Sequence, residues 1–439
     1  MRPSSLPFPL VFAWRVFIFF VVVRALMGVQ GTTLFAGKHP IINPYYQNIL
    51  INAGIAIILA VSLNLINGIT GQFSLGHAGF MAVGAYISAY FSKEIGGVLF
   101  AQLIALISVH ISKQLGTLLL TFQQPILFTI AILVGALAAG AAGFLVGLPS
   151  LRLRGDYLAI VTLGFNQIIV SLIRNWKAVG EASGYIGIPK FTTFAWVFAL
   201  AIACIWSIRN LASSALGREM RAVRDDEIAA EASGINTTRV KVVAFVYSAM
   251  WAGVAGALQA HYIQYANPND FTFLRSVEVV VSVVLGGLGS ITGSALSAAG
   301  LTVLQEVLRD VPGAFYTSVA LVGLAAYWNF VRVKSEQSGS KSMLRAFVVP
   351  FFALIAICLC YWSPQVNAVL ERVFPRLDLP DLRAALESSK GALRYVIYSV
   401  ILIVVMLLRP QGLLGRREWS LAALQRGRRV GKGVEGNLA

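Results

Sequence analysis

The sequence predicts an all-α polytopic membrane protein, and three observations carry that prediction. Hydrophobic residues make up 57% of the 439 residues, and charged residues only 12%. The mean hydropathy is +0.75, which is more apolar than a soluble globular domain requires. The apolar residues also form solid, charge-free runs of about 20 residues, the length of a helix that crosses the hydrocarbon core. A transmembrane β-barrel would instead show short segments of alternating hydrophobicity.

The apolar runs, taken in chain order, are the candidate transmembrane helices. The first, 10–29, lies behind Arg2 as in a signal peptide, but Arg15 and Arg24 interrupt it and no small-residue cleavage pattern follows. It is therefore expected to stay as a membrane span. The remaining candidates are 46–66, 74–91, 125–148, 157–173, 192–208, 242–263, 279–305, 311–331, 346–362 and 395–408.

Basic residues between the runs predict which side of the membrane each connection faces. Lys and Arg collect in the cytoplasmic connections of multi-span proteins. They are dense in 209–241 and in the tail 409–439, and Arg152 lies in a third basic connection. All three connections, and with them the C-terminus, are expected on the cytoplasmic side. The segments 174–191 and 264–275 lie one crossing away and are expected outside.

The alternation of sides fails at 279–305, because both ends of this run are counted as external. The run is therefore expected to enter the membrane and return, as a re-entrant segment. Glycines permit a sharp backbone reversal, and the run supplies them at Gly286, Gly287, Gly289 and Gly293. By the same count 96–111 does not cross fully, which leaves about ten transmembrane helices.

A second break is predicted near 64–79, where polar and flexible residues interrupt an apolar stretch. Broken membrane helices expose backbone donors and acceptors, and these line substrate pathways in transporters. Small residues are also common where membrane helices pack closely, so packing stays the alternative. The candidate pathway residues of the two breaks are Asn64, Asn67, Gly68, Gly71, Gln72, Ser74, His77, Gly79, Gly286, Gly287 and Gly289.

The segment 209–241 differs from the other connections. Its sequence "LGREMRAVRDDEIAAEASGINTTRVK" is polar, rich in alternating charges and favourable to helix. Small residues allow another backbone to approach closely, and flanking charges can pair across a protein interface. We interpret the segment as a docking element for a cytosolic partner, with a solvated loop as the alternative. The candidate contact residues are Arg224, Asp225, Glu227, Ala229, Ala230, Glu231 and Gly234.

Glu278 lies three residues after Arg275, at the start of the re-entrant run. An acidic group at membrane depth is a functional candidate by default. The spacing nevertheless favours a local ion pair on one helix face. We expect that ion pair, near the external surface.

Composition and motifs argue against several functions. The net charge is +16, but the basic residues lie between the apolar runs, so no nucleic-acid binding is expected. The three cysteines lie inside apolar runs, and neither Cys-x-x-Cys nor His-Glu-x-x-His occurs. Hence no disulfide framework, metal site or cofactor is predicted. No Gly-x-x-x-x-Gly-Lys-Ser/Thr phosphate loop is present, so the chain itself should not hydrolyse ATP, and no catalytic residue is assigned.

Six blocks, in order, resemble one family. Among them are "LNLINGITGQFSLGHAGFMAVGAY", "LPSLRLRGDYLAIVTLGF" and "NPNDFTFLRSVEVVVSVVLGGLGSITGSAL". The chain resembles the permease subunit of bacterial branched-chain amino-acid ABC importers, the LivM type. The resemblance implies one transmembrane permease domain over 1–439, in the inner (cytoplasmic) membrane, in which 209–241 is the coupling loop. Residues 311–391 depart from the family pattern and add inserted helices and an external stretch.

The resemblance also implies a function for the assembly. A second, unlike permease subunit would complete the pore, two cytosolic ATP-binding subunits would hydrolyse ATP, and a periplasmic binding protein would deliver branched-chain, hydrophobic amino acids. The same architecture importing urea or short amides is one alternative. A secondary transporter driven by an ion gradient is another, although the charge-free runs offer few groups for a proton relay.

Overall fold

The computed structural model describes residues 44–97, 113–150 and 157–307. The chain divides into two compact units, residues 1–299 with 413–439, and residues 300–412. Apart from the last turns of α12, the described residues all belong to the first unit. The predicted spans 10–29, 311–331, 346–362 and 395–408 lie outside the described residues, as do the insertion 311–391 and the tail 409–439. The total number of spans and the single-domain assignment of 1–439 stay predictions.

Helices account for most of the described chain. They are α2 (Pro44–Asn64), α3 (His77–Tyr90), α5 (Lys113–Ser150), α6 (Tyr157–Arg174), α7 (Phe194–Ser213), α8 (Ala215–Asp225), α9 (Glu227–Ala232), α10 (Thr237–Ile263), α11 (Phe273–Gly286) and α12 (Ile291–Val307). The shorter elements are the π-helical turns η1 (Leu65–Ile69) and η2 (Phe91–Gly96), the 3₁₀ turns η3 (Lys177–Val179), η4 (Glu181–Ser183) and η5 (Pro268–Phe271), and the strands β1 (Tyr185–Ile186) and β2 (Tyr265–Ala266).

The all-α polytopic fold class is confirmed. Within the described residues, 5 helices are long and apolar enough to cross a membrane, and they match the predicted runs: Tyr45–Ile69, Gln124–Gly147, Tyr157–Arg174, Phe194–Ser213 and Thr237–Ile263. The helix ends differ from the apolar runs. α5 begins at Lys113 and α10 at Thr237, well before the runs 125–148 and 242–263, because polar residues can extend a helix beyond the bilayer core. The protein is therefore a multi-pass membrane protein.

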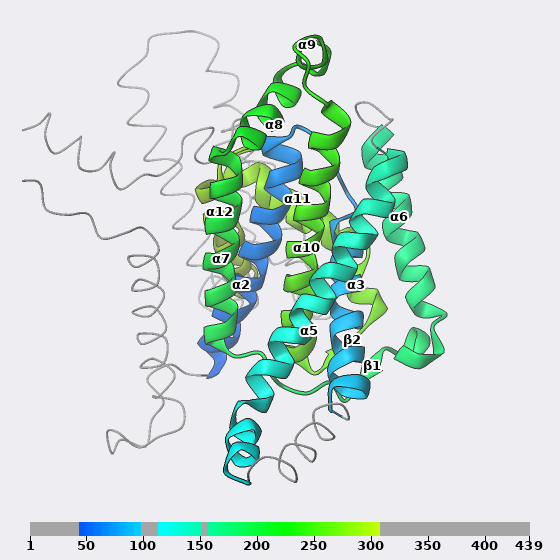
Figure 1. The fold of residues 1–439 in the computed structure, drawn as a ribbon, viewed down its shortest axis with the longest axis vertical. Helices are drawn as coiled ribbons and strands as arrows, with labels where there is room; N and C mark the ends of the chain where they lie inside the picture. The colour runs from blue at the N-terminus through cyan, green and yellow to red at the C-terminus, as the bar shows by residue number, and fades with distance from the viewer. Residues whose placement is uncertain (1–43, 98–112, 151–156, 308–439) are drawn as a thin grey trace, which may run out of the picture. The chain divides into compact units, whose positions relative to one another are not determined.

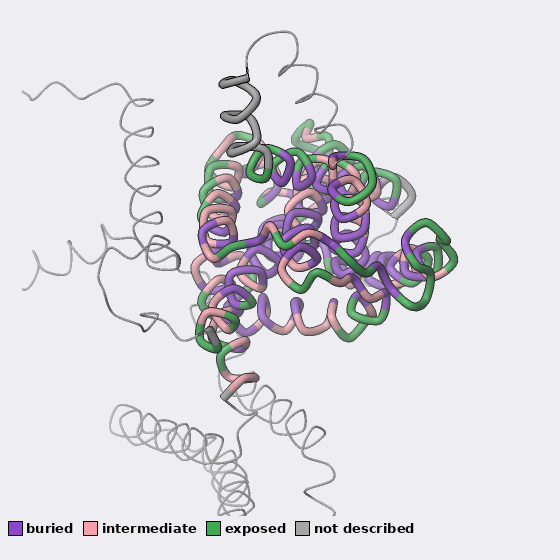
Figure 2. The backbone as a smooth tube through the Cα atoms, turned by 90° about the horizontal axis from the view of Figure 1, so that it is seen from below, coloured by how far each residue is buried: buried purple, intermediate pink, exposed green. Residues whose placement is uncertain are grey.

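α10 is the central helix of the first unit and packs most extensively against α5 and α3 (Figure 1). Three glycines, Gly84 of α3, Gly135 of α5 and Gly253 of α10, meet at this crossing. A Cβ added to Gly135 would lie 2.8 Å from the carbonyl oxygen of Gly84, and one added to Gly253 would lie 3.0 Å from that of Gly135. Small residues let membrane helices approach this closely. Figure 2 shows buried positions gathered between the helices and exposed ones on their outer faces.

The two ends of α10 carry different structures. α8 and α9 precede its first residue, whereas β1 and β2 lie at its other end and pair antiparallel, Tyr185 opposite Ala266 (Figure 1). A hydrogen bond from Arg174 Nη2 to Asn269 Oδ1, 2.8 Å long, joins the same two segments. The segments 174–191 and 264–275 thus lie together, as their expected common side requires. Which side of the membrane this end faces stays a prediction.

Candidate functional site: two helix breaks and the segment 209–241

The first break begins where η1 ends. Gln72 N donates to the carbonyl oxygen of Ile66 at 2.9 Å, and Gly71 has φ +75°. Such a positive φ is the left-handed region that glycine enters without steric cost. The chain then runs without regular structure through residues 71–76 until α3 begins at His77. The predicted break near 64–79 is confirmed as an interruption between two helices.

Side chains of other helices hold the backbone of this break. Leu75 N donates to Thr162 Oγ1 of α6 at 3.0 Å, and Ala78 N donates to Ser276 Oγ of α11 at 3.1 Å. Within the break itself, Ser74 N donates to Asn67 Oδ1 at 3.1 Å. Buried backbone groups that have no helical partner need such substitutes. The backbone of the break is therefore held in a defined conformation by hydrogen bonds to α6 and α11.

The second break is a reversal between α11 and α12. Gly287 and Gly289 have φ values of +109° and +88°. Gly286 packs directly against Gly293, and Ser297 Oγ donates to the carbonyl oxygen of Ser282. The two pairs are matched outward from the turn, so α11 and α12 run antiparallel. The expectation that the run 279–305 turns back on itself is confirmed.

The two breaks touch each other. Gly289 N donates to Asn64 Oδ1 at 2.9 Å. Gly68 lies against the same hydrogen bond, because a Cβ at Gly68 would meet both Asn64 Oδ1 and the amide nitrogen of Gly289. The sequence placed both breaks on one candidate list, and the structure brings Asn64, Gly68 and Gly289 into contact.

Carboxamide groups beside this contact keep unused hydrogen-bonding capacity. Among the described residues, Asn64 Nδ2, Asn67 Nδ2 and both polar side-chain atoms of Gln72 are buried without a hydrogen-bond partner. Asn64 is fully buried, and Asn67 and Gln72 are each 7% exposed. A buried polar atom without a partner costs about 1–3 kcal/mol, so such atoms are rare unless they serve a purpose. Donors and an acceptor are thus available here for a polar ligand.

Other residues on the candidate list have packing partners as well, and of these His77 keeps a buried Nδ1 without a hydrogen-bond partner. His77 is fully buried, and its Nε2 lies 2.8 Å from Ser62 Oγ of α2. A Cβ on Gly79 would lie 2.8 Å from Asn166 Oδ1, so this glycine allows α3 and α6 to pack. Gly286 serves the α11–α12 contact in the same way, and the Ser74 amide is bonded to Asn67. These contacts fit the packing alternative for these positions.

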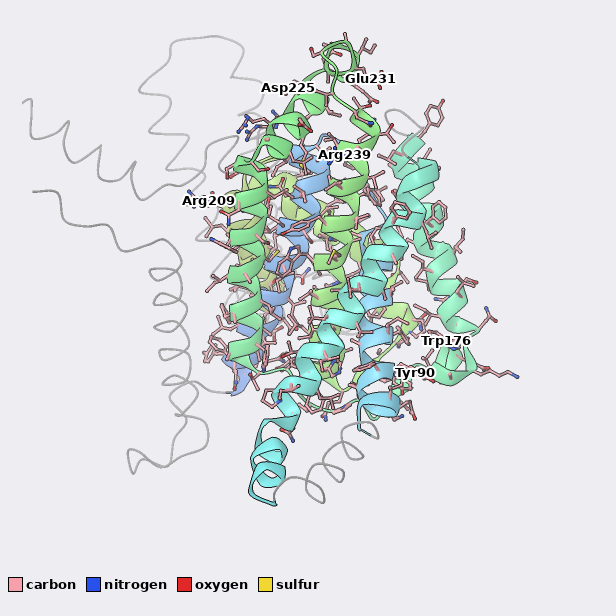
Figure 3. The ribbon with its side chains drawn as sticks, in the orientation of Figure 1. Tyr90, Trp176, Arg209, Asp225, Glu231 and Arg239 are labelled. Carbon is pink, nitrogen blue, oxygen red and sulfur yellow. The ribbon has the colours of Figure 1, made fainter. Side chains whose placement is uncertain are left out.

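The segment 209–241 consists of the end of α7, two short helices and the start of α10. Capping explains its shape: Gly217 N donates to Ser214 Oγ at the start of α8, and the amides of Ile228 and Ala229 donate to Asp226 Oδ1 at the start of α9. Side-chain oxygens at these positions satisfy amides that a helix leaves unpaired. Figure 3 labels Asp225, Glu231 and Arg239 at this end, and Tyr90 and Trp176, in ring contact at 6.0 Å, at the other.

α9 is fastened to α10 through two acidic side chains of the candidate list. Lys241 Nζ lies 2.6 Å from Glu227 Oε1, and the lysine side chain is only 6% exposed. Thr237 Oγ1 donates to Glu231 Oε1 at 2.7 Å. Ala230 is 4% exposed and packs inward. These three residues therefore set the position of α9, whereas Asp225 and Ala229 are exposed and Gly234, at φ +83°, turns the chain toward α10.

We expect Glu227→Gln to loosen α9. The change leaves the buried Lys241 ammonium without its carboxylate, at a cost of about 1–3 kcal/mol, between that of a surface pair and that of a fully buried one. Amide hydrogen exchange of the membrane-reconstituted chain should be faster in α9, while the exposed Glu181→Gln should leave it unchanged. Unchanged exchange in α9 would show that the pair does not hold this helix.

Ile228 is the residue of this segment that the sequence reasoning missed. It is 68% exposed on α9, beside the exposed Ala229 and Ala232. An isoleucine directly after three consecutive acidic residues was the available signal. Large apolar side chains that solvent can reach are common on protein surfaces, so exposure alone would not single it out. Because α9 is capped by Asp226 and bonded to α10, Ile228 is held in place as a large apolar side chain on the exposed side of α9.

Arg224 does not lie on that exposed surface. Its side chain is 21% exposed, pairs with Asp225 at 2.9 Å, and donates through Nη1 to the carbonyl oxygen of Gly68 at 3.3 Å. One residue of the candidate docking segment thus reaches the first break.

The opposite end of the first unit contains local polar contacts. Arg275 Nη1 lies 2.9 Å from Glu278 Oε2, so the predicted ion pair is confirmed. Tyr185 OH donates to Glu94 Oε1 at 3.0 Å, and burial together with this bond raises the pKa of Tyr185. Within the described residues no three His, Cys, Asp or Glu side chains lie close enough together to hold a metal ion.

The sequence of the chain is similar to those of known transport proteins. The family described as "Branched-chain amino acid transport system / permease component" matches residues 45–333. The high-affinity branched-chain amino acid transport system permease protein LivM of Salmonella typhimurium is 35% identical over 291 residues, 58% of this chain and 62% of the relative. The corresponding LivH of Escherichia coli is 27% identical over 271 residues, 57% of this chain and 80% of the relative.

A probable LivM of Methanocaldococcus jannaschii is 27% identical over 289 residues, 60% of this chain and 81% of that protein. The matched region spans 62% of the length of the LivM relative from Salmonella typhimurium. No solved structure matches the chain. The residues matched by the family include both breaks and the whole of α8 to α10. Because the match covers more than half of the chain, the chain belongs to the branched-chain amino acid transport system / permease component family.

Proposed function

We propose that the chain is the permease subunit of an ATP-driven importer of branched-chain, hydrophobic amino acids. The names of the relatives support this cargo. The observation that carries the proposal is the contact between two helix breaks, Gly289 N to Asn64 Oδ1, with unpaired buried carboxamides beside it. Irregular backbone at membrane depth is tolerated when it is buried in protein or lines a cavity, and transporters use it to bind their substrates.

The chemistry at the breaks suits a zwitterion. An amino acid carries both charges at neutral pH, so a pathway needs no full counter-charge. The free Nδ2 groups of Asn64 and Asn67 can donate to a carboxylate, and Gln72 Oε1 can accept from an ammonium group. Backbone dipoles at the broken helix ends add to both interactions. Such neutral groups offset part of the lost hydration without holding the cargo tightly, which a transport step requires.

The proposal includes the partners of the assembly. A second, unlike permease subunit would complete the pore, two cytosolic ATP-binding subunits would contact α9, and a periplasmic binding protein would deliver the cargo at the opposite end. The chain would lie in the inner (cytoplasmic) membrane of a bacterium with its C-terminus in the cytoplasm. The chain would not be an enzyme itself, since ATP hydrolysis would take place on the ATP-binding subunits.

Uptake by the reconstituted assembly tests the proposal. Vesicles that contain all the subunits should accumulate a branched-chain amino acid with ATP, should keep doing so with a protonophore, and should stop when the ATP-binding subunits lose their catalytic residues. This chain purified alone should not hydrolyse ATP. Competition by urea or a short amide would favour that cargo. Uptake by this chain alone, driven by an ion gradient, would instead establish a secondary transporter.

Ile228→Asp tests the proposed contact of α9. A charge at this exposed apolar position should weaken docking of the ATP-binding subunit, because a carboxylate would have to lose its hydration there. Uptake should fall about tenfold, which corresponds to about 1.4 kcal/mol, while the amount of inserted chain stays the same. Ile186→Asp, at a position 67% exposed at the other end of α10, is the control for copurification with the ATP-binding subunits. Normal copurification and uptake with Ile228→Asp would place the contact elsewhere.

A further inference from the structure

Arg224 connects the docking segment with both helix breaks. It lies in the last turn of α8, and its Nη1 donates to the carbonyl oxygen of Gly68 at 3.3 Å. Its stem passes Gly71, where an added Cβ would lie 3.0 Å from Arg224 Cβ, and its Nη1 would lie 3.4 Å from a Cβ at Gly289. The glycine at position 71 therefore leaves the space that this side chain occupies, and Gly289 lies within contact distance of its tip.

The contact at Gly68 has a definite electrostatic character. The last carbonyl groups of a helix have no partner in that helix and carry its partial negative charge. Gly68 belongs to η1, the final turn that extends α2 before the break. A guanidinium at this position satisfies a free carbonyl and the helix dipole at once. Arg224 is in this sense a cationic cap on α2, supplied by a helix far away in the sequence.

The remaining donors of the same guanidinium face the docking surface. Nε and Nη2 of Arg224 donate to Asp225 Oδ1 at 3.1 and 2.9 Å. Asp225 is 65% exposed. One planar group thus divides its donors between the end of α2 and a carboxylate on the exposed side of α8. A planar guanidinium can serve two acceptors in fixed directions, which an ammonium group does less well.

We propose that Arg224 is the positioning residue that couples movement of α8 and α9 to the two breaks; this rests on the proposed function. A displacement of α8 moves the cap on Gly68 and, through the hydrogen bond between Asn64 and Gly289, the turn between α11 and α12. The sequence placed Arg224 among residues that contact a partner directly. Its burial against the breaks assigns it instead to the step between partner binding and opening of the pathway.

The test measures uptake and ATP hydrolysis separately in vesicles that contain the complete assembly. Arg224→Met keeps an unbranched stem that can still pack beside Gly71, but it removes the guanidinium and every donor. We expect ATP hydrolysis close to the wild-type rate and about tenfold less amino acid taken up per ATP, within the usual range of coupling between two sites. Arg224→Lys keeps the charge but makes fewer directed bonds, so the amount of amino acid taken up per ATP should fall about threefold. Arg221→Met, on an exposed residue of the same helix, should leave the ratio unchanged.

The outcomes separate this proposal from the function on which it rests. A wild-type assembly that takes up no amino acid with ATP overturns the proposed function. With a working wild-type assembly, an unchanged ratio in Arg224→Met overturns only the role of Arg224, and so does an equal fall of uptake and hydrolysis, which would place the residue at the ATPase contact. If the methionine variant does not assemble, Arg224→Lys decides: a reduced ratio supports the coupling role, and an unchanged ratio overturns it.

Discussion

Gly253→Val is expected to prevent the chain from accumulating in the membrane. Gly253 lies where α10 crosses α5 and α3, and a Cβ at this position would lie 3.0 Å from the carbonyl oxygen of Gly135 and 3.3 Å from Ala136 Cα. Ala139 Cβ would lie closer still, at 2.5 Å. Neither backbone atoms nor the Cβ of an alanine can rotate aside as a flexible side chain would. Overpacking a well-packed core costs about 1–3 kcal/mol or more, and here the largest contact of the first unit would have to open. The amount of folded protein should fall to about a tenth or less, because folded proteins are only marginally stable and a loss of this size can unfold them.

The amount of full-length chain in detergent extracts that elutes as a single species measures this effect. Gly164→Val is the matched control, since Gly164 lies within the membrane helix α6 and nothing stands within 4 Å of its added Cβ. The control should accumulate normally. Equal losses in the two variants would mean that the effect comes from valine in a helix and not from the crossing.

Gly68→Ala should abolish most uptake per inserted chain. A methyl group at Gly68 would meet Asn64 Oδ1 and the amide nitrogen of Gly289, with Gly289 Cα at 2.9 Å. It would therefore push apart the two atoms of the hydrogen bond that joins the two breaks. We expect at least about a tenfold loss of uptake, equivalent to about 1.4 kcal/mol, because the carboxamides beside this bond would be displaced together with it.

Initial uptake rates per inserted chain, in vesicles with the complete assembly, measure this loss. Gly164→Ala controls for adding a methyl group to a membrane helix. Recovery of the assembled complex is measured beside it, because the methyl group also meets the backbone of Gly289 and only a loss per assembled complex reports on the pathway. Wild-type uptake by Gly68→Ala would show that cargo does not pass where the breaks meet.

Features set by neighbouring residues were predictable from the sequence. Gly71, Gly287 and Gly289 adopt positive φ values, and glycines clustered in a charge-free run indicated breaks at these places. Arg275 and Glu278 are one helical turn apart, and this spacing alone predicted their ion pair. The length of each apolar run likewise fixed the existence of the described spans, because the thickness of the bilayer core imposes that length.

Contacts between distant segments were not predictable in the same way. Arg224 and Gly68 are 156 residues apart, so whether the arginine faces the pore or a partner depends on where α8 lies against α2. His77 was a candidate pathway residue because its neighbours are polar, but the sequence could not show that its Nε2 meets Ser62 on the other side of the break. Gly253 and Gly164 look alike in sequence, yet one faces a crossing helix and the other faces open space. Tertiary packing decides each case.

The hydroxyl groups that hold the first break bear on the order in which the protein is assembled. The amides of Leu75 and Ala78 are bonded to Thr162 and Ser276, which lie 87 and 198 residues further along the chain. During synthesis, α2 and α3 are therefore made long before either hydroxyl is present. Until then these two amides need water or another substitute partner. An insertion intermediate that ends at α10 would already contain α2, α3 and α6 and would still lack the hydroxyl that completes the start of α3.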